Sequence, residues 1–175
     1  MRLADASTRF EEVLRAGPGV KLYGQVVNLN QGSTTFDFPV RQLLVNANSL
    51  ARAGMEVVTT GGFRYLLAEN LDDLQAGVVS RSFIMIRLDR VDMHTRYGKT
   101  VDPVTGLDRG SSPIGQPQQV WYQARSLRLS EGVLNIPEAR YSIITGADIA
   151  EGDTLGDLRI LHVENRLGVK FAEAR

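Results

Sequence analysis

The sequence has no cysteine, no long apolar run and no excess of charge of either sign. Without cysteine, the 175 residues cannot form disulfides, a thiolate nucleophile or a zinc–thiolate site. No apolar run approaches the roughly 20 residues of a membrane-spanning helix, and the segment MRLADASTRF is too polar for a signal peptide. We therefore expect a protein that stays in the cytoplasm where it is made and has no membrane partner.

The charges of the chain are balanced, because it has twenty Lys and Arg residues and twenty Asp and Glu residues. A conventional nucleic-acid-binding protein needs a cationic surface that displaces counterions from phosphate, so the balance argues against that class. It does not exclude a protein past which DNA slides. The hydrophobic content of 43% is typical of a soluble globular protein, and the length suffices for one large domain or two small ones.

Residues 1–18 have the pattern of an amphipathic helix that ends at a strong stop signal, Gly17 followed by Pro18. This N-terminal helix either packs on its own domain or docks on a neighbouring subunit, in which case Phe10 and Leu14 are candidate contacts. The apolar residues at helical spacing are Leu3, Ala6, Phe10, Val13 and Leu14.

Most of the remaining chain has the character of short β-strands. Segments such as KLYGQVVNLN and SRSFIMIRLDRV are rich in β-branched, aromatic and aliphatic residues, and Gly, Asn, Asp and Pro separate them at regular spacing. The pair Gly61–Gly62 joins two such segments as a tight hairpin. This pattern predicts a mainly β protein built from small barrel-like units.

One stretch of sequence occurs twice in similar form, as GGFRYLLAEN at 61–70 and GDLRILHVEN at 156–165. The repeated order of turns and strands predicts an internal duplication, with a first β-barrel-like unit at 20–92 and a second at 120–175. The alternative is one larger sheet whose hairpins reuse the same turn chemistry. The matching residues are Gly61/Gly156, Arg64/Arg159, Leu66/Leu161, Glu69/Glu164 and Asn70/Asn165, with Pro39/Pro137 and Gly54/Gly152 upstream.

Residues 93–119 lie between the two units and have almost no apolar periodicity. Gly, Pro, Ser and Asp dominate this stretch, and long segments without secondary structure are either linkers or functional loops. We expect an extended loop or linker here. It is either a solvated linker or a loop that becomes ordered when it meets a partner.

The titratable residues form no visible catalytic constellation, so we expect no enzymatic activity and no cofactor. The pairs Asp92-x-His94 and His162-x-Glu164 each place two polar side chains on one face of a strand, as metal ligands require. Because two such distant pairs rarely converge, we predict no metal site. A small barrel with exposed aromatic residues stacks bases in OB-folds, so an OB-like nucleic-acid or ligand binding module is an alternative. The aromatic residues concerned are Tyr23, Phe63, Tyr65, Trp121 and Tyr122.

Residues 141–175 read as a strand, then the element D-I-A-E-G-D at 148–153, then a hairpin that closes with G-V-K-F-A. This order, with Asp148, Ile149, Gly152 and Asp153 in the D-hydrophobic-x-x-G-D positions, resembles the small β-barrel of head–tail connector (neck, stopper or head-closure) proteins of tailed bacteriophages. The first copy departs from the pattern, because Gly54-Met55 stands where the second copy has Gly152-Asp153.

The resemblance implies a structural virion protein that is assembled in the host cytoplasm and forms a six- or twelvefold ring between portal or adaptor and tail proteins. Genomic DNA passes through such a ring without tight binding, which suits the balanced charge. A capsid cement or baseplate structural protein is the alternative within the virion. Besides Phe10 and Leu14, the residues that we expect at subunit or partner contacts are Arg96, Lys99, Arg109 and Arg125.

Overall fold

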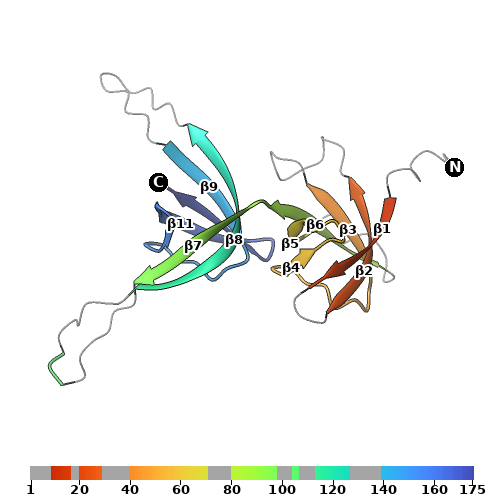
Figure 1. The fold of residues 1–175 in the computed structure, drawn as a ribbon, viewed down its shortest axis with the longest axis horizontal. Coiled ribbons are helices and arrows are strands. Elements are labelled where there is room, and N and C mark those ends of the chain that lie inside the picture. The colour runs from red at the N-terminus through yellow and green to blue at the C-terminus, as the bar shows by residue number, and fades with distance from the viewer. Residues whose placement is uncertain are drawn as a thin grey trace. The chain divides into compact units, whose positions relative to one another are not determined.

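All the regular secondary structure that the computed structural model describes is β-strand (Figure 1). No helix long and apolar enough to cross a membrane occurs among those residues. The described residues are 9–16, 20–28, 40–70, 80–97, 104–106, 113–126 and 139–175. Their strands are β1 (Arg9–Arg15), β2 (Lys21–Asn28), β3 (Arg41–Asn46), β4 (Glu56–Val58), β5 (Arg64–Glu69), β6 (Ser80–Leu88), β7 (Arg90–Tyr97), β8 (Pro113–Ser126), β9 (Ala139–Thr145), β10 (Thr154–Leu155), β11 (Leu158–Arg166) and β12 (Val169–Ala174).

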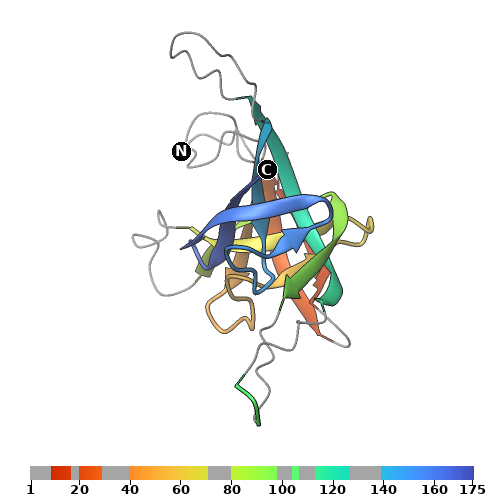
Figure 2. The same ribbon diagram turned by 90° about the vertical axis from the view of Figure 1, so that its left-hand side faces the viewer.

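The chain folds into two compact units, and each contains a closed six-stranded barrel. The first unit is Met1–Asp89 with Asn165–Val169, and the second is Arg90–Glu164 with Lys170–Arg175. The strand order is β1-β2-β3-β6-β5-β4 in the first barrel and, read in the same sense, β7-β8-β9-β12-β11-β10 in the second. Figure 2 shows the strands of the second barrel, in green to blue, curving around one another. The mainly β fold with tandem barrels is therefore confirmed, and the two barrels share one topology.

The repeated stretches of sequence lie on equivalent hairpins of the two barrels. Gly61 and Gly156 lie in the β4–β5 and β10–β11 turns. Arg64 and Arg159 lie on β5 and β11, which are the fifth strands of their barrels. Arg64 and Arg159 therefore lie on matching strands, as expected, but they do not occupy equivalent positions within those strands.

Backbone hydrogen bonds set the correspondence two residues away from the gapless alignment. The Gly54 N–H donates to the Leu67 carbonyl over 2.8 Å, and the Gly152 N–H donates to the Ile160 carbonyl over 2.9 Å. Leu67 therefore corresponds to Ile160, whereas the gapless alignment of the two stretches pairs Ile160 with Tyr65. A shift of two residues keeps every side chain on the same face of its strand, so the repeat in the sequence still marks the correct elements.

Each barrel has its own apolar core, formed by inward-facing residues that alternate along the strands. Among the described residues, the first core has twelve buried members and the second has seven. The central positions correspond: Leu43 and Ile143 are both fully buried, as are Leu67 and, very nearly, Ile160. The smaller core of the second barrel is supplemented by polar side chains at one edge, described below.

The helix predicted for residues 1–18 is wrong where the structure describes that segment. Arg9–Arg15 form β1, which pairs with β2 along its whole length, from Arg9 opposite Val27 to Arg15 opposite Lys21. Pairing within the barrel overrides the helical spacing of the apolar residues. The rest of the expected helix, at 1–8 and 17–18, lies outside the described residues.

The two ends of the extended loop expected at 93–119 are strands of the second barrel. These ends belong to β7 and β8, which pair from Arg90 opposite Val120 to Tyr97 opposite Pro113. The boundary between the units therefore falls at Asp89 rather than after residue 92. The sequence lacked apolar periodicity because β7 carries polar residues on its inward face. Residues 98–103 and 107–112 lie outside the described part of the chain.

Candidate functional site

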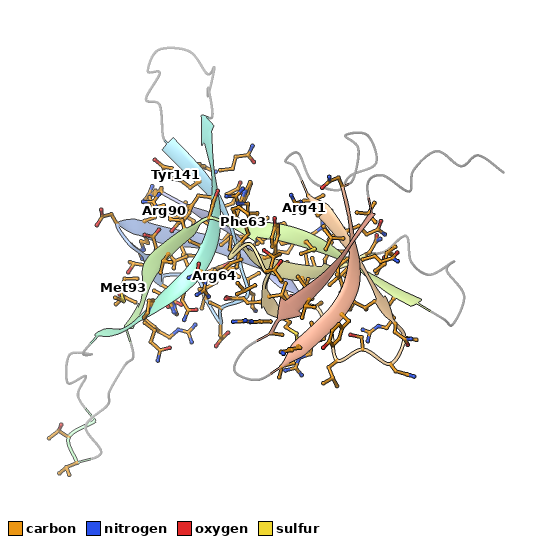
Figure 3. The ribbon with its side chains drawn as sticks, turned by 45° about the vertical axis from the view of Figure 1, so that its right-hand side comes forward. Arg41, Phe63, Arg64, Arg90, Met93 and Tyr141 are labelled. Carbon is orange, nitrogen blue, oxygen red and sulfur yellow. The ribbon has the colours of Figure 1, made fainter. Side chains whose placement is uncertain are left out.

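Strand β7 has its polar residues on the inward face and its apolar residues on the outward face. Val91 and Met93 are 53% and 51% exposed, while the alternating Asp92, His94 and Arg96 are partly buried. Successive side chains of a strand point to opposite faces, so this is the reverse of the usual pattern for a barrel strand. Met93 is labelled on β7 in Figure 3. The inversion indicates that the inner face of β7 has polar partners.

Those partners meet at Asp153, which follows the loop after β9. The Asp153 Oδ2 atom lies 2.8 Å from His94 Nε2, and it accepts hydrogen bonds from Arg96 Nη2 at 3.0 Å and from the Ala150 amide at 2.8 Å. The side chains of Asp153 and His94 are only 6% and 12% exposed. We call His94, Arg96, Asp148 and Asp153 the seam cluster.

Arg96 also binds the loop itself. Its Nη2 donates to the Asp148 carbonyl over 2.6 Å, and its Nη1 lies 3.4 Å from the Asp148 carboxylate. The loop from Gly146 to Asp153 is thereby held against β7 at both ends. Since Arg96 presents a planar fork of donors, one guanidinium can bind both a backbone carbonyl and a buried carboxylate.

The cluster lies where the second barrel closes. Strands β7 and β10 pair over two residues only, Thr95 opposite Thr154 and His94 opposite Leu155. We call this short ladder the second seam, and the corresponding ladder of β1 and β4, where Arg15 pairs with Val58, the first seam. The side-chain contacts of Asp153 with His94 and Arg96 therefore add to a short backbone ladder across the seam.

The charge state of Asp153 follows from two opposing effects. Burial acts to raise its pKa, but the hydrogen bonds from Arg96, His94 and the Ala150 amide, together with the charge of Arg96, outweigh burial and bring the pKa below its usual value. The same contacts raise the pKa of Arg96. Asp153 is therefore an ionised, hydrogen-bonded carboxylate at neutral pH, and its partners are satisfied within the fold.

The first barrel has apolar residues at the positions of the seam cluster. Leu67 N–H donates to the Met55 carbonyl and Ile160 N–H donates to the Asp153 carbonyl, both over 2.9 Å, so Met55 corresponds to Asp153.

The residues three positions after Met55 and Asp153 show which residues of the facing strands correspond. Val58 pairs with Arg15 in the first barrel, and the Gly156 N–H donates to the Met93 carbonyl in the second. Arg15 therefore corresponds to Met93, and the next buried residue, Ala16, corresponds to His94.

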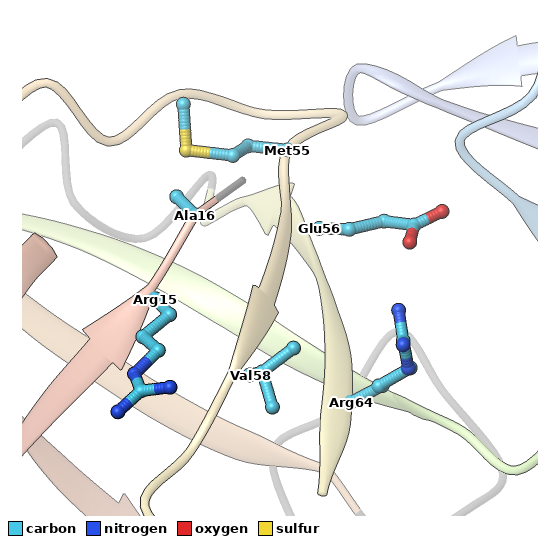
Figure 4. Close-up of a pocket in the computed structure, with 6 residues that line it drawn as sticks. All are labelled: Arg15, Ala16, Met55, Glu56, Val58 and Arg64. Atoms are coloured by element: carbon cyan, nitrogen blue, oxygen red, sulfur yellow. The ribbon is translucent and has the colours of Figure 1, made fainter. Parts of the chain in front are cut away.

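A pocket of about 540 Å³ opens at the first seam (Figure 4). Its apolar lining comes from Ala16, Met55 and Val58, and its charged lining from Arg15, Glu56 and Arg64. Figure 4 shows the Glu56 and Arg64 side chains turned toward each other. Desolvation raises the pKa of Glu56, and the charge of Arg64 acts in the opposite direction. At the first seam, Ala16 and Met55 thus border a pocket, whereas His94 and Asp153 bind each other at the corresponding positions of the second barrel.

The residues predicted at partner contacts are placed differently from one another. Leu14 is fully buried in the first core, so none of its side chain is available to a partner. Arg96 belongs to the seam cluster, where Asp148 and Asp153 occupy it. Phe10 lies on β1 opposite Val26, and Arg125 lies on β8 opposite Arg140. Lys99 and Arg109 lie outside the described residues.

The two histidine pairs noted in the sequence do not converge. His94 contacts Asp153, and His162 Nδ1 lies 2.9 Å from Glu151 Oε1. In the described part of the chain, no three His, Asp or Glu side chains are grouped as metal ligands. The sequence places Asp153 only in a turn motif. Nothing in it indicates that Asp153 contacts His94 on β7, 59 residues earlier.

Comparison of the chain with protein-family models, with curated proteins and with solved structures finds no match.

Proposed function

We propose that this protein is a structural component of a tailed-bacteriophage virion, forming a ring in the neck between portal and tail through which DNA passes. The observation that carries the proposal is the pair of closed barrels of identical strand order, separated by the single residue Asp89 between β6 and β7. The resemblance of residues 141–175 to the small barrel of connector proteins supports it.

Closed barrels suit a protein that assembles in a controlled way. A sheet closed on itself has no unpaired edge strand onto which other chains can add. Contacts between copies must therefore come from side chains and turns, which specify one geometry instead of open-ended stacking. Because each chain has two barrels of the same strand order, a ring contains twice as many similar barrels as it has chains.

The polar residues inside the second barrel also favour a structural role. A catalytic acid or base needs an open position for substrate, whereas the Asp153 carboxylate is held by His94, Arg96 and the Ala150 amide. These contacts close a seam of the barrel. The balanced charge of the chain suits a bore that does not grip phosphate.

The test is the mass and shape of the purified full chain, with its affinity for DNA. We expect rings in negative-stain images, alone or after addition of a portal or tail partner, and binding of duplex or single-stranded DNA no tighter than about 10⁻⁴ M at physiological salt. A monomer that binds DNA tightly would favour the OB-like module instead. Specific decoration of capsids, or a trimer that binds tail tips, would favour the cement or baseplate role.

A further inference from the structure

One end of the interior of the first barrel carries two arginines stacked on aromatic rings. The guanidinium carbon of Arg87 lies 4.7 Å from the centroid of the Phe63 ring, and that of Arg41 lies 5.7 Å from the centroid of the Tyr65 ring. Phe63 precedes β5 by one residue and lies two residues before Tyr65, on the same face. We call Arg41 and Arg87 with these two rings the arginine mouth; Figure 3 labels Arg41 and Phe63.

The two cations are neighbours by strand register. Arg41 on β3 pairs with Met85 on β6, and Arg87 lies two residues further along the same face of β6. Such diagonal neighbours have Cα atoms about 7–8 Å apart. Among the described residues, no carboxylate lies within ion-pair distance of either arginine, and Asp89, two residues beyond Arg87, pairs with neither. Two like charges so close favour an anion between them.

Stacking prepares these arginines to bind carboxylates. A guanidinium that lies over an aromatic ring keeps its N–H groups pointing outward in its own plane, where they form paired hydrogen bonds to a carboxylate. Its side chain is also already ordered, so binding costs less conformational entropy. The mouth therefore suits an acidic protein surface.

The second barrel has such a surface beside its seam. Residues 146–158 contain four acidic residues and no Lys, Arg or His. Asp153 is buried, but the side chains of Asp148 and Glu151 are 86% and 60% exposed, with Arg96 and His162 beside them, and Asp157 is exposed as well. We call Asp148, Glu151 and Asp157 the acidic loop.

We propose that the arginine mouth of one copy binds the acidic loop of a second copy of this chain. The proposal rests on the ring proposed above, and charge complementarity carries it. Because the two surfaces differ, the contact is head-to-tail, and repeated head-to-tail contacts close into a ring when the rotation between copies permits.

The test is sedimentation velocity of the full chain at about 0.15 M and about 1 M salt. We expect wild type to assemble at low salt, and R41E/R87E and E151Q/D157N each to weaken assembly at least about tenfold. The control R52E/R81E makes the same change of charge and removes the stacking of Arg81 on Phe83, at the other end of the barrel interior. It should assemble as wild type does. Combining R41E/R87E with E151K/D157K should restore assembly.

The outcomes separate this inference from the ring itself. If wild type stays monomeric at every concentration, this contact between copies is wrong, and the images taken with a portal or tail partner then decide the ring. If all variants assemble as wild type does, the ring stands and the contact is wrong. Glu151 and Asp157 are exposed and lie outside the seam cluster, so E151Q/D157N keeps the test valid even if R41E/R87E unfolds. If an oligonucleotide binds wild type and R41E/R87E abolishes that binding, the mouth binds phosphate and our assignment is overturned.

Discussion

The two barrels have the same strand order, but the weakest point of each closure is built differently. In the first barrel, Ala16 and Met55 border an open pocket at the seam. In the second, His94 and Asp153 occupy the corresponding positions and bind each other, with Arg96 completing the cluster. Closure of the first barrel at its seam therefore depends on apolar packing, and closure of the second depends on charged side chains.

The difference shows that the barrel topology does not require a particular chemistry at its seam. An ion pair removed from water recovers its desolvation cost only when geometry and further hydrogen bonds are good. Asp153 has such bonds, from two side chains and one backbone amide. We therefore expect the stability of the second barrel, unlike that of the first, to depend strongly on Asp153 and on pH.

The largest expected effect comes from removing that residue. Asp153→Ala removes the acceptor of His94 and leaves Arg96 with Asp148 alone, and loss of one member of a buried ion pair costs about 3 kcal/mol. The single tryptophan, Trp121, lies on β8 of the second barrel, so urea unfolding followed by its fluorescence measures that barrel. A cost of less than about 1 kcal/mol would mean that the seam cluster adds little to closure.

A second variant of the same site introduces the apolar residues of the first seam into the second barrel. His94→Ala with Asp153→Met reproduces the residues of the first seam. Because apolar replacement of a whole buried pair is often neutral, we expect the double variant to be more stable than Asp153→Ala alone. A double variant that is less stable than Asp153→Ala would contradict the correspondence between the seams.

The next effect concerns a glycine of the first barrel. A Cβ at Gly24 would lie 2.8 Å from the Leu44 carbonyl oxygen and 2.7 Å from Leu43 Cδ1. Since the backbone cannot move cheaply, Gly24→Ala should destabilise the first barrel by about 2 kcal/mol. The strand glycine of the second barrel, Gly115, is the control, because its nearest neighbour is the flexible Met93 side chain at 3.3 Å. Thermal unfolding of both variants measures the stability that each loses. Equal losses would contradict the expectation that the crowding around Gly24 is what destabilises its variant.

A smaller effect concerns Tyr122, on the inner face of β8. Burial raises the pKa of Tyr122, and the nearby Asp92 carboxylate acts in the same direction, so the hydroxyl stays protonated. That hydroxyl is buried, and among the described residues it forms no hydrogen bond of good geometry. An unsatisfied buried polar group is costly. Tyr122→Phe should therefore leave the second barrel unchanged or stabilise it by about 1 kcal/mol. A clear loss of stability in the same urea assay would reveal a partner for the hydroxyl.

The smallest effect concerns Glu56 at the first seam. Its pKa is raised, chiefly by desolvation, so its ionisation in the folded state is unfavourable, and its contribution to stability falls as pH rises above the usual value. Glu56→Gln should stabilise the first barrel at neutral pH, within about 0.5 kcal/mol, and less in acid. Native-state hydrogen exchange of the β5 amides measures this. A loss of protection would show that the attraction to Arg64 dominates instead.

Much of the fold was predictable because barrel hairpins have local signatures. The β4–β5 and β10–β11 turns need glycines at defined positions, and Gly62 and Gly156 both have positive φ. The repeat around Arg64 and Arg159 therefore identified equivalent strands correctly. Only the register needed the backbone hydrogen bonds, because a shift of two residues preserves the pattern of faces.

The errors have a common physical origin, which is that long-range pairing decides the structure of short segments. The apolar spacing near Leu14 suits a helix or a strand, and β2 provides the partner that selects the strand. The polar residues of β7 resemble a linker until Asp153 is brought opposite them. No local pattern reports that contact, so the seam cluster could not be derived from the sequence.

The central claim is that an ionised Asp153 closes the second barrel, and its most direct test is the pH dependence of the Trp121 unfolding transition. The pKa of Asp153 is lowered in the fold, so its contribution is fully present above the unfolded value of about 3.9 and is lost as pH falls through that value toward the folded pKa. Between about pH 7 and pH 3, wild type should lose more stability than Asp153→Asn, and the two curves should converge in acid. Parallel curves for the two proteins would contradict the claim.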